Sequence, residues 1–207
     1  MKIKFLFLSA FLAFVLGAFL GCAEEKVVND FEFKEFEEGE QITLQSVMNK
    51  QLVLVRQNGG FVILNDEKKV LMVDIFGTFC APCKEEAPHL TQLWRKNADK
   101  FTLIGLTHFE SVSDDEVRNF ANNYGAFYFI SNQKQNERLV KQILKDINYQ
   151  NMEQLPFKVV LKNGVYQSVQ DFWNKGKRVK FYLGKVPTSL MQEDLKGILG
   201  QKNGTAN

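Results

Sequence analysis

Apolar runs bounded by polar turns divide the chain from residue 41 onward into short segments of strand and helix. The longest run, Val70–Phe76, is typical of a strand buried on both faces, and Phe101–Phe109 predicts a second central strand. Between these strands, Leu90, Leu93 and Trp94 recur at helical spacing, so we expect a helix that begins near residue 80.

The same alternation continues toward the C-terminus. Ser113 and Glu116 form a capping box that opens a helix, and Phe127–Ile130 predicts a short strand. Further helices are expected around residues 139–147 and at Ser189–Leu199. Strands that alternate with helices in this way favour an α/β fold whose sheet contains parallel strands.

Before residue 70 the pattern changes to strands joined by a tight turn. Gln51–Arg56 and Phe61–Leu64 are typical of short strands, and Asn58-Gly59-Gly60 between them is a hairpin signal. We therefore expect an N-terminal hairpin that leads into the buried strand.

Residues 1–21 have the pattern of a secretory signal peptide. A basic start precedes the uncharged apolar run Phe5–Leu20, and small residues follow just before Cys22. The ending Phe19-Leu20-Gly21-Cys22 resembles the bacterial lipobox, in which the cysteine is lipidated, although Phe19 stands where that motif normally has Leu. We expect an exported, extracytoplasmic protein anchored to a membrane by lipid on Cys22. Plain secretion with cleavage after Ala23, and an uncleaved anchor, remain alternatives.

An acidic tether at 22–40 is expected to hold the folded part away from the lipid. Eight acidic residues and two lysines lie between residues 24 and 40, a composition that favours solvation over a packed core. Phe31, Phe33 and Phe36 leave two alternatives open, an added edge strand or packing on the domain. The folded domain is expected at 41–200, followed by a flexible tail at 201–207.

Composition narrows the possible functions. The 207-residue chain has a net charge of +2 and no basic stripe with interleaved aromatics, which argues against a nucleic-acid partner. The folded part, about 165 residues, has the size of one domain with one core. We expect a monomer.

The chemistry is concentrated in two of the three cysteines. Cys80 and Cys83 stand at the predicted helix start, where two cysteines at this spacing have Cα atoms about 5–6 Å apart, within disulfide range. Unpaired N–H groups and the helix dipole favour an anion at Cys80, lower the pKa of its thiol and make it the attacking group. Cys83, one turn inside, would resolve the mixed disulfide.

Two carboxylates accompany this pair. Asp74 interrupts the apolar strand, and a buried acid there could relay the proton of Cys83. Glu86 lies one helical turn beyond Cys83 and could serve the same thiols. The alternative for Asp74 is a solvent-facing position on an edge strand.

The cysteine pair has two other possible uses. A zinc site needs about four ligands, and the sequence offers no second pair, so we expect neither a metal nor any other cofactor. A structural disulfide is the remaining alternative, because the domain would lie outside the cytosol.

Residues 70–94 resemble the active-site strand and helix of the thioredoxin superfamily, and Cys-Ala-Pro-Cys-Lys-Glu-Glu-Ala-Pro resembles its membrane-anchored TlpA/ResA branch. Lys84, Glu86 and Pro88 match that branch, and Asp74 matches the buried acid of thioredoxin. Phe79 stands where the family usually has Trp, which implies an aromatic substrate-docking position without the indole N–H. The resemblance implies a three-layer α/β/α sandwich with a mixed central sheet.

The resemblance also implies a cis-proline strand that pairs with an extended substrate. Leu155-Pro156 begins a strand that runs into Asn163-Gly164, and Phe181–Leu183 supplies the hairpin strand that must follow. Val186-Pro187 spells the family tripeptide more closely, but only one helix follows it. The 73-residue separation of Cys83 and Pro156 suits family members with an inserted strand–helix unit.

These observations predict an exported, membrane-tethered thiol:disulfide oxidoreductase. By resemblance it would reduce a few exported proteins, such as apocytochrome c or another thiol enzyme, and would be recharged by a membrane electron carrier. An oxidant that donates disulfides through the same site is one alternative. A copper-binding or copper-delivery lipoprotein is the other, although related copper chaperones space their cysteines by three residues and add a histidine. We expect His89 and His108 to be ordinary surface or packing residues and Trp173 to lie in a solvated loop.

Overall fold

A computed structural model describes residues 33–67, 69–150 and 152–200 of the chain. The expected signal peptide, the expected lipidation site Cys22, Phe31 and the tail at 201–207 lie outside these residues. Within the described residues, no helix is both long enough and apolar enough to cross a membrane.

The centre of the fold is a mixed β-sheet. Its strands run in the spatial order β11-β7-β4-β5-β6. β8 pairs with the C-terminal end of β7. β4, β5 and β6 are parallel, whereas β7 is antiparallel to β4 and to β11. The bounds are β4 Val70–Phe76, β5 Phe101–Thr107, β6 Phe129–Ser131, β7 Phe157–Lys162, β8 Val165–Tyr166 and β11 Phe181–Leu183.

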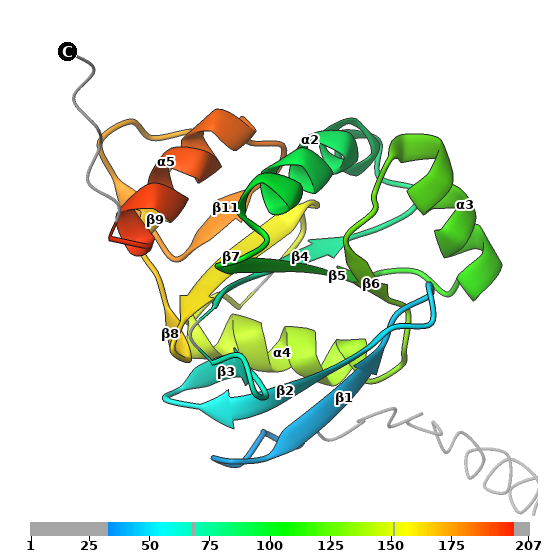
Figure 1. The fold of residues 1–207 in the computed structure, drawn as a ribbon, viewed down its shortest axis with the longest axis horizontal. Coiled ribbons are helices and arrows are strands. Elements are labelled where there is room, and N and C mark those ends of the chain that lie inside the picture. The colour runs from blue at the N-terminus through cyan, green and yellow to red at the C-terminus, as the bar shows by residue number, and fades with distance from the viewer. Residues whose placement is uncertain (1–32, 68, 151, 201–207) are drawn as a thin grey trace, which may run out of the picture. The chain divides into compact units, whose positions relative to one another are not determined.

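Helices cover both faces of this sheet (Figure 1). Along β4, Met72 and Phe76 enter the apolar cluster shared with α2, α3 and α5, whereas Val73 and Ile75 enter the cluster shared with α4. The helices are α2 Ala81–Asn97, α3 Asp114–Tyr124, α4 Asn136–Asp146 and α5 Thr188–Ile198. The three-layer α/β/α architecture is therefore confirmed, and β6 with α4 is the strand–helix unit expected before the proline strand.

A second sheet, in which β1 and β3 flank β2, precedes β4. β2 Gln51–Gln57 and β3 Gly60–Ile63 form the expected hairpin, with Asn58 and Gly59 both at positive φ in the turn. β1 Gln41–Gln45 pairs with β2 and was not predicted. Its two buried residues, Ile42 and Leu44, alternate with exposed polar residues, and a pattern this short is a weak signal.

Of the phenylalanines before residue 41, Phe36 packs on the domain and does not add an edge strand. Its ring meets Phe61 edge to face at 5.2 Å, and the guanidinium of Arg138 lies 3.7 Å from its centroid. Its backbone N–H donates to Gln142 Oε1 at 2.8 Å. The last residues of the expected tether therefore belong to the fold.

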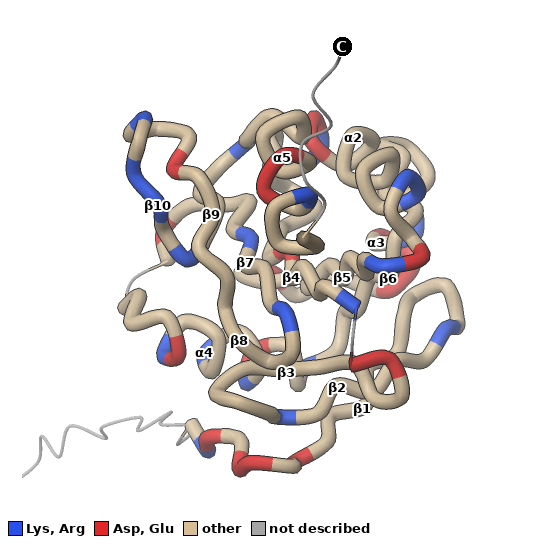
Figure 2. Tube along the Cα trace, turned by 60° about the vertical axis from the view of Figure 1, so that its left-hand side comes forward, with Lys and Arg blue, Asp and Glu red and all other residues tan. Residues whose placement is uncertain are grey.

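Several boundaries differ from the sequence expectations. β5 ends at Thr107, because Phe109 has a φ of 61°, a left-handed conformation that interrupts a strand. The segment around Trp173 contains a small two-stranded sheet, β9 Val169–Gln170 and β10 Arg178–Val179, instead of loop alone. Figure 2 shows lysine and arginine residues in β10 and in the chain next to it.

A buried ion pair joins the N-terminal sheet to α4. Arg56 on β2 makes a two-pronged contact with Asp146, including a 2.7 Å hydrogen bond from Nη2 to Oδ1, and both side chains are at most 10% exposed. Gln142 and Tyr166 also donate to Asp146, at 2.8 and 2.9 Å. The carboxylate is therefore satisfied from α4, β2 and β8 together.

Asp146→Ala should lower the free energy of unfolding by about 3–5 kcal/mol, because it leaves the buried Arg56 charge uncompensated. Urea denaturation of the oxidised protein measures the change. Glu137→Ala is the control: it removes a side chain that is 61% exposed and paired with Lys141, and should cost less than about 0.5 kcal/mol. Equal effects of the two variants would contradict this prediction.

Candidate functional site

Cys80 and Cys83 form a disulfide at the N-terminus of α2. Their Cα atoms are 5.3 Å apart, within the range expected from their spacing. Cys80 is the N-cap of the helix, and its sulfur accepts the backbone N–H of Cys83 at 3.2 Å. Pro82 occupies the first turn, where its missing N–H leaves no helical bond unmade.

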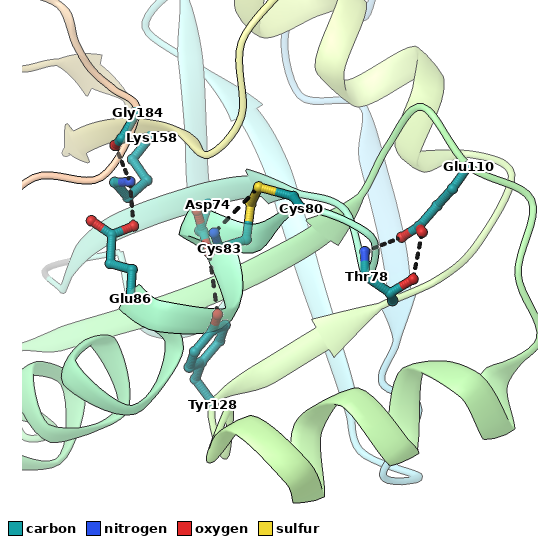
Figure 3. The surroundings of a disulfide bond; sticks show 9 residues. All are labelled: Asp74, Thr78, Cys80, Cys83, Glu86, Glu110, Tyr128, Lys158 and Gly184. Atoms are coloured by element: carbon teal, nitrogen blue, oxygen red, sulfur yellow. Dashed lines mark hydrogen bonds and ion pairs between the residues drawn. A yellow bond between two sulfur atoms is a disulfide. The ribbon is translucent and has the colours of Figure 1, made fainter.

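This position suits a thiolate at Cys80. The first-turn N–H groups and the positive end of the helix dipole favour negative charge on the N-cap sulfur. In the disulfide form, Cys80 is 7% exposed and Cys83 4%. Both sulfurs therefore lie at the edge of the core, at the end of β4 (Figure 3).

The turn before Cys80 is tied to the segment after β5. Glu110 accepts two hydrogen bonds from Thr78, from the backbone N–H at 2.8 Å and from Oγ1 at 2.6 Å. A Cβ on Gly77 would lie 2.5 Å from the Phe79 ring, so this ring packs directly over the glycine and would have to move to admit a side chain there. Phe79 is 60% exposed beside the disulfide, and Phe109, in the segment that Glu110 anchors, is 54% exposed.

Asp74 is buried in the central strand. Only 2% of its surface is exposed, so the alternative of a solvent-facing edge position is wrong. Tyr128 donates its hydroxyl to Oδ2 at 3.2 Å, whereas Oδ1 has no hydrogen-bond partner among the described residues. Loss of solvation raises the pKa of Asp74 to about 7, and the charge of Glu86 adds to this, while Lys158 and the Tyr128 hydrogen bond oppose it.

Glu86 lies on α2 with 1% of its surface exposed. Its Oε2 accepts from Lys158 Nζ at 2.6 Å, and its Oε1 accepts from the backbone N–H of Val186 at 3.0 Å. In Figure 3 this pair lies on one side of the disulfide, and the Thr78–Glu110 contact lies on the other. Glu86 thus connects the active-site helix to β7 and to the segment after β11.

The peptide bond between Leu155 and Pro156 is cis, as the resemblance implied. The carbonyl of Pro156 accepts the N–H of Gly184 at 2.8 Å, and Leu155 is half-buried. The rival proline, Pro187, immediately precedes α5 in an ordinary helix-start position. The structure therefore agrees with the choice of Pro156.

Sequence reasoning did not identify three residues of this site: Lys158, Tyr128 and Glu110. Lys158 had a usable signal, because it interrupts the apolar run Phe157–Leu161 as Asp74 interrupts its own strand. Tyr128 and Glu110 lie in segments whose sequence gives no sign of what they will contact.

Neither histidine takes part in the contacts around the disulfide. His89 is exposed, and His108 is half-buried with its ring 4.1 Å from that of Phe109. Burial lowers the pKa of His108. Among residues 33–67, 69–150 and 152–200, no three or more His, Cys, Asp or Glu side chains are grouped as a metal site.

Curated relatives match part of the chain. The thiol-disulfide oxidoreductase ResA of Bacillus thuringiensis (strain Al Hakam) is 35% identical over 75 residues, which cover 35% of this chain and 42% of ResA. The thioredoxin-like protein YneN of Bacillus subtilis (strain 168) is 34% identical over 64 residues, covering 30% of this chain and 37% of YneN. The matches thus span less than half the length of these relatives.

Solved structures are similar over most of the chain. A thiol:disulfide interchange protein of the thioredoxin family from Chlorobium tepidum has a TM-score of 0.53 at 18% identity, covering 81% of this chain and 99% of that one. An exposed lipoprotein thioredoxin from Streptococcus pneumoniae has a TM-score of 0.52 at 12% identity, covering 76% and 99%. At these identities the likeness concerns the fold.

A family model described as thioredoxin matches residues 51–154, about half of the chain. That range includes β4, the disulfide and the whole of α2, and it ends just before the cis Leu155–Pro156 bond. The chain belongs to the thioredoxin family.

Proposed function

We propose that this protein is a thiol:disulfide oxidoreductase that reduces disulfides of exported client proteins. The observation that carries the proposal is the cysteine pair at the start of α2, with Cys80 as N-cap and Cys83 one turn inside. The names of the curated relatives support the reaction class.

The reaction consists of two thiol–disulfide exchanges. The Cys80 thiolate attacks a client disulfide, forms a mixed disulfide and releases one client thiolate. Cys83 then attacks the Cys80 sulfur, closes the internal disulfide and releases the second client thiolate. Two electrons pass from the cysteine pair to the client, and the client sulfurs take up protons.

Asp74 is proposed to handle the proton of Cys83. The second exchange needs Cys83 as a thiolate, so a base must accept its proton. A carboxyl whose pKa is raised to about 7 can both accept and return a proton near neutral pH. Glu86 is proposed to support the same proton site, since it lies on the helix that carries both cysteines.

Phe79, Leu155 and Pro156 are proposed to contact the client. Phe79 offers a largely exposed aromatic face next to Cys80. Pro156 has no N–H of its own, and the backbone of Leu155 is proposed to pair with an extended client segment. Hydrogen bonds to backbone alone would admit clients of varied sequence.

The cellular setting follows from the leader sequence and from the chemistry. We infer an extracytoplasmic protein anchored by lipid on Cys22, with the domain held from the membrane by the part of the acidic segment that precedes residue 33. In an oxidising compartment the pair stays reduced only if electrons arrive across the membrane, so a membrane electron carrier is the proposed redox partner. Apocytochrome c or another thiol enzyme is the proposed client.

Cys83→Ser should trap the client. The mixed disulfide at Cys80 forms but has no second thiol to resolve it, so a covalent complex accumulates. Non-reducing electrophoresis followed by mass spectrometry identifies the partner. Cys80→Ser is the matched control and should form no such complex. Absence of any trapped protein in cells grown under several conditions would contradict the proposal.

The reduction potential of the Cys80–Cys83 pair should lie near that of thioredoxin, about −270 mV, when equilibrated with dithiothreitol or glutathione. Such a potential favours giving electrons to clients. A value near about −120 mV would replace the reductant with the oxidant that donates disulfides. A value below about −300 mV would identify a structural disulfide.

Asp74→Asn should remove a pH dependence from the second exchange. In the parent, the rate rises as pH passes through about 7, because Asp74 becomes the carboxylate that accepts the Cys83 proton. In the variant the rise should wait until the thiol itself ionises, with a rate at pH 7 at least about tenfold lower. Rapid mixing of reduced protein with a disulfide peptide at pH 5–9 measures both profiles, and identical profiles would contradict the role of Asp74.

Measuring the free energy of unfolding against pH shows whether Asp74→Asn slows the exchange without destabilising the protein. The folded protein holds a proton on Asp74 between its ordinary pKa of 3.8 and about 7, so the parent loses stability as pH rises through that range. Asp74→Asn avoids the loss and should be more stable than the parent at pH 8 and similar at pH 4. Asp99→Asn, at a carboxyl 72% exposed, should change neither profile.

A further inference from the structure

Lys158 is a lysine with no exposed side-chain surface in the middle of an apolar strand. Burying an ammonium group costs several kcal/mol unless it is paired and hydrogen-bonded. The chain also places two carboxyl groups, Asp74 and Glu86, in the same part of the core. Neither the proposed exchange nor the need for a packed core accounts for a lysine here.

Strand register places Lys158 directly beside Asp74. The two residues are opposite one another in the antiparallel pairing of β4 and β7. Side chains that are directly opposite point to the same face of a sheet, with Cβ atoms about 4.5–5.5 Å apart. The neighbours Met72 and Val160 enter the cluster shared with α2, so Asp74 and Lys158 point toward the active-site helix.

The ammonium group of Lys158 is directed by two contacts. Nζ lies 2.6 Å from Glu86 Oε2 and 3.1 Å from the carbonyl oxygen of Gly184, to which it donates (Figure 3). The second oxygen of Glu86 accepts the N–H of Val186. Both oxygens of Glu86 are therefore hydrogen-bond acceptors.

The two acids are treated differently by their surroundings. Glu86 accepts hydrogen bonds from a cation and a backbone N–H, whereas Asp74, among the described residues, accepts one only from the hydroxyl of Tyr128. The groups that face this site are Asp74 from β4, Glu86 from α2, Lys158 from β7 and Tyr128 from the segment before β6. One positive charge thus serves two carboxyl groups, and it lies on the Glu86 side.

We propose that Lys158 is a positioning residue for the redox reaction: its ammonium group pairs with Glu86, so that Asp74 is the carboxyl group that exchanges a proton with Cys83. The inference rests on the proposed role of Asp74 in the second exchange. In that step the proton leaves Cys83 for the Asp74 carboxylate, the Cys83–Cys80 bond forms and the bond from Cys80 to the client breaks.

A purely structural ion pair predicts a different result from this assignment. If Lys158 only stabilises the fold, its removal lowers stability and leaves the titration of Asp74 unchanged. If Lys158 sets the charge of the site, its removal raises the pH at which Asp74 loses its proton. Removal of Glu86 lowers that pH, because Asp74 then has the cation without the competing carboxylate.

The test follows the Asp74 carboxyl directly. The full chain, labelled with ¹³C at aspartate carboxyl groups, is titrated in the oxidised form by NMR, and Asp74→Asn identifies the signal. Lys158→Met should raise the titration midpoint by about 1 pH unit or more, and Glu86→Gln should lower it. Lys158→Arg keeps the charge and should restore the parent midpoint to within about half a unit.

Lys185→Met is the matched control. It removes a lysine that is 50% exposed and paired with Glu85 on the same helix, so the Asp74 midpoint should not move. An unchanged or lowered midpoint in Lys158→Met would overturn the inference. So would equal shifts in Lys158→Met and Lys185→Met.

A second comparison covers the case in which Lys158→Met does not fold. Replacing the pair together, as Glu86→Gln with Lys158→Met, leaves no unpaired buried charge from the pair. The double variant should titrate Asp74 at a higher pH than Glu86→Gln alone, and an equal midpoint would overturn the inference.

The same samples separate this inference from the proposed function. Exchange of the parent with glutathione tests the cysteine chemistry without reference to Lys158. A parent that exchanges while the Asp74 midpoint ignores Lys158 refutes only the present inference. A parent that fails to exchange, with the midpoints shifted as described, refutes the proposed function and leaves the electrostatic role of Lys158 intact.

Discussion

The site depends on the burial of β4 between β5 and β7. This pairing positions two groups of the site: it holds Asp74 inside the core, and it places Cys80 at the start of α2. Because β4 is covered on both faces, its one carboxyl group has no water to stabilise its charge, and its pKa rises. The same burial that stabilises the fold therefore raises the pKa of this carboxyl group to about 7, as its proposed role in proton transfer requires.

Among the described residues, the one buried side-chain N or O atom without a hydrogen-bond partner is Oδ1 of Asp74. Glu86 accepts hydrogen bonds from Lys158 and from the Val186 N–H, and Lys158 also donates to the Gly184 carbonyl. Within the described residues, Asp74 accepts a hydrogen bond from the hydroxyl of Tyr128 alone. Buried ion pairs contribute little net stability when desolvation is included. The proposed value of the Glu86–Lys158 pair is therefore functional: it makes Asp74 the acid that exchanges a proton with Cys83. Arg56 and Asp146, by contrast, connect two parts of the fold far from the cysteines in the sequence.

Sequence reasoning succeeded where the signal is local. The largely apolar run at 70–76, the capping box at Ser113 and Glu116, and the turn at Asn58-Gly59 each specify structure through neighbouring residues, and the structure contains all three. β1 was missed because its burial depends on a partner strand, and β5 was drawn too long because the left-handed Phe109 has no signature in residue type. The proline strand was identified through family resemblance and the order of strands that follow it.

The sequence by itself determined the cysteine pair, its place at a helix start and the α/β architecture, because spacing and hydrophobic periodicity are properties of contiguous residues. Only the tertiary structure decided that Asp74 is buried, that Lys158 lies opposite it on the neighbouring strand β7, and that Lys158 bonds Glu86 instead of solvent. These outcomes depend on strand register and on which helix covers which face. A charged residue in an apolar run indicates that it has a partner in the core. The fold determines which residue that is, and Glu86 and Lys158 are 72 residues apart in the sequence.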